Sequence, residues 1–342
     1  MKAFVTGATG LLGNNLVRLL VQQGHEVKAL VRSKEKAQKL LGDVTNVESI
    51  QGDMENVSGF AKNLEGCDVL FHTAAYFREY YQPGDHWPKL EKINVLGTVE
   101  LLEAADRHGV KKAVHVSSSG VIGEADGTAN EDTAASGLAL ENLYFRSKVE
   151  TEKAVAGFLK THKMPVVMIL PGWMYGPGDA APTSAGQLVQ DFLGRKLPGV
   201  LNGGAMIADA RDVAQAMIKA VDKGKNGERY IVGGKLYKLA DIMHTLEKVS
   251  GVPAPKFRIP TPLALTIAWV SQTIARLTGG TTLLTVSGIQ TIANPHQISS
   301  EKAVRELGTK FRSLEDTLKD TVNWYRQQAT QSTTLQREVV KT

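Results

Sequence analysis

The sequence predicts an α/β protein built on a doubly wound parallel sheet, with a small, interleaved and mostly helical C-terminal part. Three observations predict this class. A short apolar strand at residues 3–6 runs directly into a glycine-rich turn and then into an amphipathic helix at residues 14–23. Strand and helix patterns alternate from there to a sixth strand at residues 165–170. Strands that are each followed by a helix pair in parallel and need helices on both faces of the sheet.

The first turn has the spacing of a loop that binds a diphosphate. Gly7 lets the chain turn sharply off the strand, Gly10 lets backbone N–H groups approach a pyrophosphate, and Gly13 lets the helix pack close to the sheet. The diphosphate would lie on a helix N-terminus, which favours an anion. An ordinary strand–helix connection is the competing interpretation. The residues that we expect to hold a dinucleotide here are Gly7, Thr9, Gly10, Leu11, Leu12 and Gly13.

The hydrophobic fraction, the cysteine count and the net charge limit which classes of protein this chain can belong to. The 342 residues are 42% hydrophobic, enough to fill one α/β unit with an elaborated second part. The single cysteine, Cys67, excludes an intramolecular disulfide, and residues 3–6 leave no room for a signal peptide, so we expect a cytoplasmic protein. The net charge of +5 comes from scattered cations, which argues against nucleic acid as a partner. We predict no metal ligands.

The end of the second strand, residues 25–32, indicates which dinucleotide binds. An NAD-binding unit carries an acidic side chain here, about 20 residues after the glycines, to accept hydrogen bonds from the ribose 2′-OH. This chain has Arg32, followed by Ser33 and Lys34. A guanidinium can pair with a 2′-phosphate and a hydroxyl can donate to it. We therefore expect NADP(H) to be preferred over NAD(H), against the alternative of a solvated surface arginine.

Two further strand ends carry candidate cofactor contacts. After the third strand, residues 47–51, Asp53 is placed to meet an adenine amino group and Met54 to pack on the ring; a helix N-cap is the alternative role for Asp53. After the fourth strand, residues 68–73, small residues would let the cofactor pass close by. His72 lies inside that apolar strand and is interpreted as a core residue. The contacts expected after the fourth strand are Thr73, Ala74 and Ala75.

An aromatic loop and a long helix separate the fourth and fifth strands. The helix is expected over residues 89–108, and a shorter one over residues 57–64 precedes the fourth strand. The irregular loop follows the C-terminal end of a parallel strand, where such loops commonly shape a ligand pocket. Its aromatic residues are Tyr76, Phe77, Tyr80, Tyr81 and Trp87.

The fifth strand, residues 110–117, leads to candidate catalytic groups. Tyr144 and Lys148 are four residues apart on one face of a predicted helix that runs to about Lys160. A nearby ammonium favours phenolate and lowers the phenol pKa from about 10 towards working pH, which makes tyrosine a usable proton donor. The strand itself ends in the serine run Ser117, Ser118 and Ser119, before Gly123.

Together, these motifs resemble the extended short-chain dehydrogenase/reductases of the NAD-dependent epimerase/dehydratase superfamily. The likeness extends from Met1 to about Gln328 and is greatest to the dihydroflavonol-4-reductase-like branch, which includes plant and bacterial carbonyl reductases. The segments that carry it are Thr6–Gly13, Val31-Arg32, Phe71–Ala75, Val116–Gly123, Tyr144-x-x-x-Lys148 and Leu170–Gly178.

The resemblance implies a role for each candidate. Tyr144 would be the general acid, and Lys148 its electrostatic partner and a ribose ligand. Ser118 would donate to the substrate carbonyl, with Ser119 as the alternative. Asn94 would support a proton relay, or make a structural hydrogen bond instead. By the same resemblance, Pro171 would lie beside the nicotinamide carboxamide.

The resemblance also implies how the chain is divided. A Rossmann-type NADP(H)-binding domain would span residues 1–180, with segments around 205–235 returning to it, and a substrate-binding part would span residues 181–328. The polar residues 329–342 are expected to form a disordered tail. Other expected elements are helices at 186–193, 209–213 onward, 239–250 and 313–328, and a strand at 230–234.

An apolar stretch at residues 261–277 has three interpretations. It is too short, and too interrupted by polar residues, for a membrane span of about 20 residues. A buried core helix or an apolar lid over the substrate is favoured, and contact with a membrane surface is the third option.

The resulting hypothesis is an NADPH-dependent reductase that passes hydride to a ketone or aldehyde of a small, largely apolar substrate, acting as a monomer or homodimer. The alternative is a nucleotide-sugar epimerase or dehydratase with bound NAD, for which Arg195, Lys196 and Arg211 could bind the sugar nucleotide. A dinucleotide-sensing protein without activity is disfavoured by the presence of Ser118, Tyr144 and Lys148 together.

Overall fold

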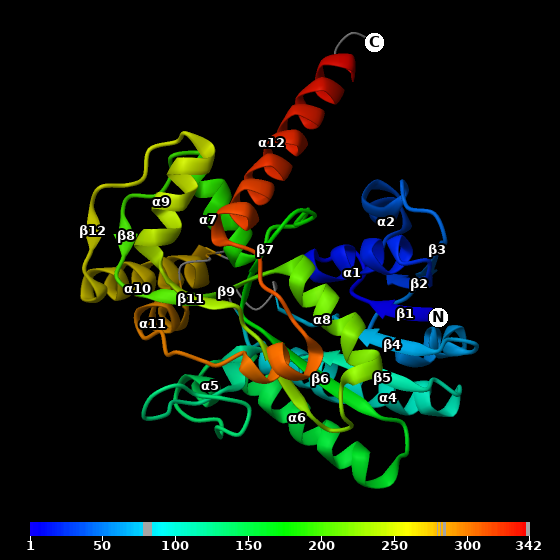
Figure 1. Ribbon diagram of the computed structural model, residues 1–342. Coiled ribbons are helices and arrows are strands. Elements are labelled where there is room, and N and C mark those ends of the chain that lie inside the picture. Colours follow the sequence, from blue (N-terminus) through cyan, green and yellow to red (C-terminus); the bar gives the residue numbers. More distant parts are fainter. Residues whose placement is uncertain (78–83, 279, 281, 283–284, 340–342) are drawn as a thin grey trace.

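The computed structural model confirms an α/β fold around one large parallel sheet (Figure 1). It describes residues 1–77, 84–278, 280, 282 and 285–339. The strand order reverses between β1 and β4, and ligands of open parallel sheets bind at such a point. From edge to edge the strands are β10 (Arg229–Val232), β6 (Val166–Pro171), β5 (Lys112–Val116), β4 (Val69–His72), β1 (Lys2–Thr6), β2 (Glu26–Val31) and β3 (Val47–Gln51).

Helices cover both faces of this sheet, because successive side chains of a strand point to opposite faces. Ala3 and Val5 of β1 pack in one buried cluster, and Phe4 between them packs in the other. The first cluster lies under α1 (Leu11–Gln22), α2 (Lys34–Leu41) and α8 (Ala210–Lys223), and the second under α4 (Gly97–Arg107) and α6 (Leu143–Thr161).

Two predicted helices take a different form. Residues 57–64 form two short 3-10 turns, η1 (Val57–Gly59) and η2 (Ala61–Leu64), because a glycine in the middle disfavours a continuous helix. The helix predicted over residues 89–108 consists of α3 (Trp87–Leu90), the π-helical turn η4 (Glu91–Leu96) and α4 in direct succession. Such π turns are frequent near functional sites.

Most of the remaining elements build a second, smaller layer with its own core. Phe192, Ile242 and Leu318 meet there and are almost fully buried. The strands are β11 (Lys235–Lys238), β9 (Gly204–Asp209) and β7 (Trp173–Tyr175) in one sheet and β12 (Arg258–Ile259) with β8 (Val200–Leu201) in another. The helices of this layer are α7 (Ser184–Leu193), α9 (Leu239–Ser250), α10 (Thr261–Thr278), α11 (Val286–Ala293) and α12 (Leu314–Val339). Three short elements pack with the large sheet instead: η5 (Ser119–Val121) and α5 (Leu138–Glu141) lie against α6, and η6 (Ala303–Leu307) lies against α8 and β10.

The last helix is longer than the sequence prediction. Residues 329–342 were expected to be disordered, yet α12 continues to Val339 and extends away from the other elements in Figure 1. Residues 340–342 lie outside the described part of the chain. Residues 329–339 contain neither glycine nor proline, so nothing in the backbone chemistry ends the helix at Gln328. No helix in the described part of the chain is long and apolar enough to cross a membrane.

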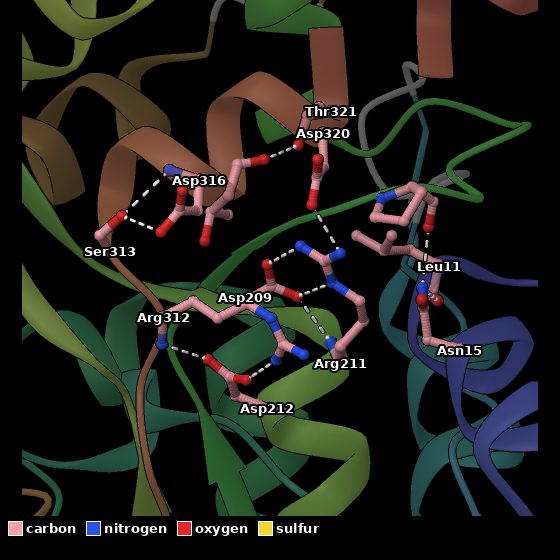
Figure 2. Close-up of polar contacts among 12 residues, drawn as sticks. Leu11, Asn15, Asp209, Arg211, Asp212, Arg312, Ser313, Asp316, Asp320 and Thr321 are labelled. Carbon is pink, nitrogen blue, oxygen red and sulfur yellow. Dashed lines mark hydrogen bonds and ion pairs between the residues drawn. The ribbon is translucent and has the colours of Figure 1, made fainter. Parts of the chain in front are cut away.

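A cluster of charged side chains joins the start of α8 to the start of α12 (Figure 2). The guanidinium of Arg211 donates to both carboxylate oxygens of Asp209, at 2.9 and 2.6 Å, and to Asp320 Oδ2 at 2.7 Å. The hydrogen bonds that Arg211 donates to Asp209 raise the pKa of Arg211. Nearby, the backbone N–H of Arg312 donates to Asp212 at 2.7 Å. These bonds hold the start of α12 against α8, which covers one face of the large sheet.

Replacing Arg211 with methionine is expected to lower the free energy of unfolding by about 3 kcal/mol, because Asp209 is fully buried and would keep an unpaired charge. Arg18→Met is the matched control. Asp43, the partner of Arg18, is largely exposed, so the loss of this ion pair is expected to lower the free energy of unfolding by less than about 1 kcal/mol. Urea unfolding of both variants measures this difference, and equal losses would contradict the role assigned to the cluster.

Candidate active site

The glycine turn after β1 has the geometry of a phosphate cradle. Gly7 has a φ of +68°, and a Cβ there would lie 2.7 Å from Thr73 Oγ1. A Cβ at Gly13 would collide with the carbonyl oxygen of Gly7. Gly10 is the N-cap of α1, and neither a capping side chain nor an acidic residue occupies the first turn of that helix. Its first N–H groups therefore lack intrahelical partners and suit an anion.

This turn opens into a cavity of about 840 Å³. That volume is within the range of small-molecule and cofactor sites. The residues predicted to contact the dinucleotide all line it: Gly7, Thr9, Gly10, Leu11, Leu12, Gly13, Arg32, Asp53, Met54, Thr73, Ala74, Ala75, Tyr144, Lys148 and Pro171. Of the predicted catalytic residues, Ser118, Tyr144 and Lys148 also line it. The chain thus brings residues from six strand ends and α6 to one cavity, which fits a bound dinucleotide.

At the end of β2, Arg32 lines the cavity together with Lys36, which the sequence analysis missed. Lys36 lies in the first turn of α2, the helix that follows the strand end carrying Arg32. Ser33 has a different role from the one predicted. Its hydroxyl caps α2 by accepting from the N–H of Lys36 at 3.1 Å, and it donates to Glu35 at 2.7 Å.

The end of β3 contributes a polar and an apolar group. Asp53 Oδ1 accepts from the N–H of Glu55 at 2.9 Å, and the residue lines the cavity. Met54 is 7% exposed and packs in the buried cluster under α4 while it still reaches the cavity wall. Asp53 therefore caps no helix; Asn56 caps η1.

Around the end of β4, polar side chains hold the backbone in place. Thr73 Oγ1 donates to the carbonyl of Thr6 at 2.7 Å, and the N–H of Ala74 donates to Thr6 Oγ1 at 3.2 Å. His72 is 1% exposed, and its ring nitrogens are 2.7 Å from Thr6 Oγ1 and 2.9 Å from Thr98 Oγ1. Burial lowers the pKa of His72 to about 3, so it stays neutral. His72 is a core residue, as interpreted from the sequence.

Tyr144 and Lys148 are positioned by the start of α6. Asn142 caps the helix, its side chain accepting from the N–H groups of Tyr144 at 3.0 Å and Phe145 at 3.2 Å. One turn later, Lys148 Nζ donates to the carbonyl of Val116 at 2.9 Å and lies 5.9 Å from the centre of the Tyr144 ring. Burial lowers the pKa of Lys148 to about 8, against an opposing effect of Glu152. A cation therefore lies near the phenol at neutral pH.

The three serines after β5 line the cavity with different surroundings. Ser117 Oγ donates to Glu152 Oε1 at 2.5 Å, so its hydroxyl hydrogen is not free to donate to a substrate. Ser119 is 8% exposed. Ser118 is more exposed, and its Oγ accepts from the N–H of Gly120 at 3.1 Å, so its hydroxyl hydrogen remains able to donate to a substrate oxygen. This geometry supports Ser118 over Ser119 as the catalytic serine.

Asn94 lies in the π turn η4 and does not itself line the cavity, although it contacts Tyr76, which does. Its side chain accepts from the N–H of Tyr76 at 2.7 Å and donates to the Tyr76 carbonyl at 3.2 Å and to Ser147 Oγ at 3.1 Å. The amide thus ties the cavity loop to α6. The alternative weighed from the sequence was a structural hydrogen bond from helix to strand; the partners here are a loop and a helix. A proton-relay role for Asn94 stays a prediction.

The aromatic loop contributes to the cavity as expected. Tyr76 and Phe77 line it, and the Phe77 ring lies 4.6 Å from that of Tyr144. Trp87 lies further out, where the guanidinium of Arg146 sits 4.4 Å from its ring. Tyr80 and Tyr81 lie outside the described residues.

The opposite wall of the cavity comes from residues 181–298 and is mainly apolar. Among the described residues, the lysines and arginines that line the cavity all belong to the first 150 residues, so this wall carries no such cation. No local pattern in the sequence marked these wall residues, since they are gathered from many separate segments. They include Leu188, Leu197, Met206, Leu239, Ile267 and Ile289.

Three known proteins are similar to this chain over nearly its whole length. A protein of Synechocystis sp. that is provisionally named dihydroflavonol 4-reductase is 32% identical over 329 residues, covering 94% of each chain. Sterol demethylase protein B of Methylococcus capsulatus is 32% identical over 330 residues, covering 96% of this chain and 99% of that one. The crystal structure of gox2253 superposes with a TM-score of 0.80 at 31% identity, over 95% of this chain and 98% of that one.

The family model for the NAD dependent epimerase/dehydratase family matches residues 3–233, which include the glycine turn, Ser118, Tyr144 and Lys148. The chain therefore belongs to the NAD dependent epimerase/dehydratase family, that is, to the extended short-chain dehydrogenase/reductases, and is an NAD(P)-dependent oxidoreductase of the dihydroflavonol-4-reductase-like kind.

Proposed function

We propose that this chain is an NADPH-dependent reductase of a ketone or aldehyde group on a small, largely apolar or aromatic substrate. The observation that carries the proposal is the cavity itself. One continuous space joins the phosphate cradle and Arg32 to Ser118, Tyr144 and Lys148, and then to an apolar wall. Two relatives carry names that refer to a dihydroflavonol and to a sterol, and both kinds of compound contain ring systems.

Bound NADPH would supply the hydride that reduces the carbonyl carbon. The residues of this chain place and protonate the oxygen. Ser118 donates a hydrogen bond to that oxygen as negative charge develops, and Tyr144 transfers its phenolic proton to it. Lys148 stabilises the phenolate that remains, because its ammonium is held near the ring by the Val116 carbonyl. The hydrogen bond from Ser117 to Glu152 fixes the start of the serine run.

Arg32 supports the preference for NADPH, since a guanidinium can pair with the 2′-phosphate. We expect Arg32→Ala to raise the dissociation constant for NADPH about thirtyfold, the loss of one charge-assisted interaction, and to leave that for NADH nearly unchanged. Titration of intrinsic fluorescence with each dinucleotide measures both constants.

The matched control for Arg32→Ala is Lys34→Ala. Lys34 is two residues away and is absent from the cavity lining, so its removal should leave both constants within about twofold. Equal affinity of the unmodified chain for NADPH and NADH would refute the preference.

The alternative, a nucleotide-sugar epimerase or dehydratase with tightly bound NAD, has less support. Arg195 and Lys196 do not belong to the cavity lining, and neither does Arg211. Arg211 is instead held by Asp209 and Asp320. A sugar nucleotide's diphosphate would meet an apolar wall in this cavity, and burying it there without cations is costly.

Two further proposals accompany this function. We take residues 1–180, with the return at 205–235, as the dinucleotide-binding domain and residues 181–328 as the substrate-binding part; the pairing of β10 with β6 supports the return. The chain is proposed to act as a monomer or homodimer.

A further inference from the structure

Helix α10 presents an apolar face to solvent. Its residues Ala264, Ala268 and Ala275 are at most 5% exposed and face the rest of the protein. The opposite side carries five large apolar residues at helical spacing, which are between 40 and 82% exposed. We call these residues the α10 stripe: Leu263, Ile267, Val270, Ile274 and Leu277. An apolar helix face normally packs against another surface, and none covers this one among the described residues.

Two aromatic side chains extend this apolar surface. Trp269 is 63% exposed at the edge of the α10 stripe, and Phe257, beside β12, is 59% exposed. Of the eleven large apolar side chains exposed in the described part of the chain, seven belong to residues 257–277. Figure 1 places α10 and β12 together at the margin of the smaller layer. Such a concentration of exposed apolar groups marks an interaction site.

The lysines and arginines of residues 251–300 are not balanced by any acidic residue in that segment. Lys256, Arg258 and Arg276 are exposed, and no aspartate or glutamate occurs anywhere in residues 251–300. Arg276 lies on the same side of α10 as Trp269, seven residues further along. Lysine and arginine beside an apolar helical face are the pattern of helices that lie in the surface of anionic membranes, with tryptophan at the level of the headgroups.

We propose that the α10 stripe, with Phe257 and Trp269, docks on the surface of an anionic lipid bilayer. Apolar side chains would enter the boundary between headgroups and acyl chains while Lys256, Arg258 and Arg276 pair with lipid phosphates. A second copy of this chain is a poorer occupant. In a two-fold symmetric dimer the same cationic patch would face itself, with no acidic residue of this segment to offset the repulsion.

The same helix also lines the cavity. Ala264 and Ile267 both belong to the cavity wall, and Ile267 is part of the α10 stripe as well. Helix α10 therefore contributes to both the docked surface and the wall of the cavity. Resting on the proposed function, this arrangement names the substrate class: a membrane-soluble carbonyl compound that enters beside α10 from the lipid.

Vesicle sedimentation tests the docking without any need for turnover. The full chain is mixed with vesicles of phosphatidylcholine and phosphatidylglycerol, or of phosphatidylcholine alone, and the bound fraction is measured after centrifugation. We expect binding to the anionic vesicles, weaker binding to the neutral ones, and loss of binding as salt is raised. Absence of binding to both vesicle types would overturn the proposal and would leave the reductase assignment untouched.

Matched variants locate the contact. Ile274→Glu, in the middle of the α10 stripe, should weaken binding to anionic vesicles at least about tenfold. Val304→Glu is the control, because Val304 is similarly exposed (47% against 55% for Ile274) but lies in η6. Arg276→Gln, a milder change, should weaken binding about fivefold. Equal binding by all variants would overturn the proposal, as would a lipid-free dimer in sedimentation velocity that Ile274→Glu dissociates.

Discussion

Replacing Tyr144 with phenylalanine is expected to lower kcat for carbonyl reduction about a thousandfold, with little change in the dissociation constant of NADPH. The phenol is the proton donor in this account, and a positioned general acid contributes about a hundredfold to ten-thousandfold to rate. The ring itself is kept by the substitution, so its packing against Phe77 at 4.6 Å is preserved. Steady-state NADPH oxidation together with fluorescence titration separates the chemical step from binding.

Tyr237→Phe is the matched control for this loss. Tyr237 is partly buried in β11 and is absent from the cavity lining, so its hydroxyl should be dispensable for turnover. Turnover by the Tyr144 variant at the rate of the unmodified chain would refute the proton-donor assignment. An equal loss in both variants would point to a structural cause instead.

Replacing Lys148 with methionine is expected to lower kcat about a hundredfold and to change the pH dependence of what remains. The pKa of Lys148 is lowered to about 8 by burial. Below that pH the lysine is cationic and strengthens the phenol as an acid; above it the lysine is neutral and the acid weakens. The rate of the unmodified chain should therefore fall as pH rises through about 8.

In Lys148→Met the phenol has no neighbouring ammonium, so its pKa should return towards about 10 and the alkaline fall in rate should move upward with it. Lys112→Met is the control. Lys112 is also partly buried, with its pKa lowered by burial, but its Nζ donates to the carbonyls of Val221 and Gly224 away from the cavity. A pH profile that is the same with and without Lys148 would contradict the pairing with Tyr144.

The dinucleotide end of the site could be predicted because its residues are tied to strand ends. Parallel strands bring their C-terminal ends to one edge of the sheet, so Gly7, Arg32 and Thr73 come together whatever lies between them. The residue type at the end of β2, an arginine, then indicated a preference for NADP(H). The sequence did not show which side chain near a given strand end faces the cavity. Ser33 and Lys36 both suit a phosphate by composition, and helix capping decided that Ser33 faces its own helix.

The substrate end could not be predicted in the same way. Met206 of β9 and Ile289 of α11 line one wall, yet more than 80 residues of chain separate them, and no periodic pattern links the two. Helix α10 shows the same limit. Its sequence allowed a core helix, a lid or a membrane contact, and the packed structure gives it a buried alanine side, a place in the cavity wall and an exposed apolar face. Hydropathy alone does not show whether an apolar residue is buried in the core, lines the cavity or is exposed to solvent.

The most direct test of the central claim is NADPH oxidation by the purified chain across aromatic ketones, aldehydes, steroid ketones and flavonoids, with each product identified by mass. A carbonyl-reducing site with an apolar wall predicts consumption of NADPH with at least one class of apolar carbonyl compound, and one alcohol formed for each NADPH consumed. If no carbonyl compound consumes NADPH, while the chain is isolated with tightly bound NAD and interconverts nucleotide sugars, the proposed function is contradicted.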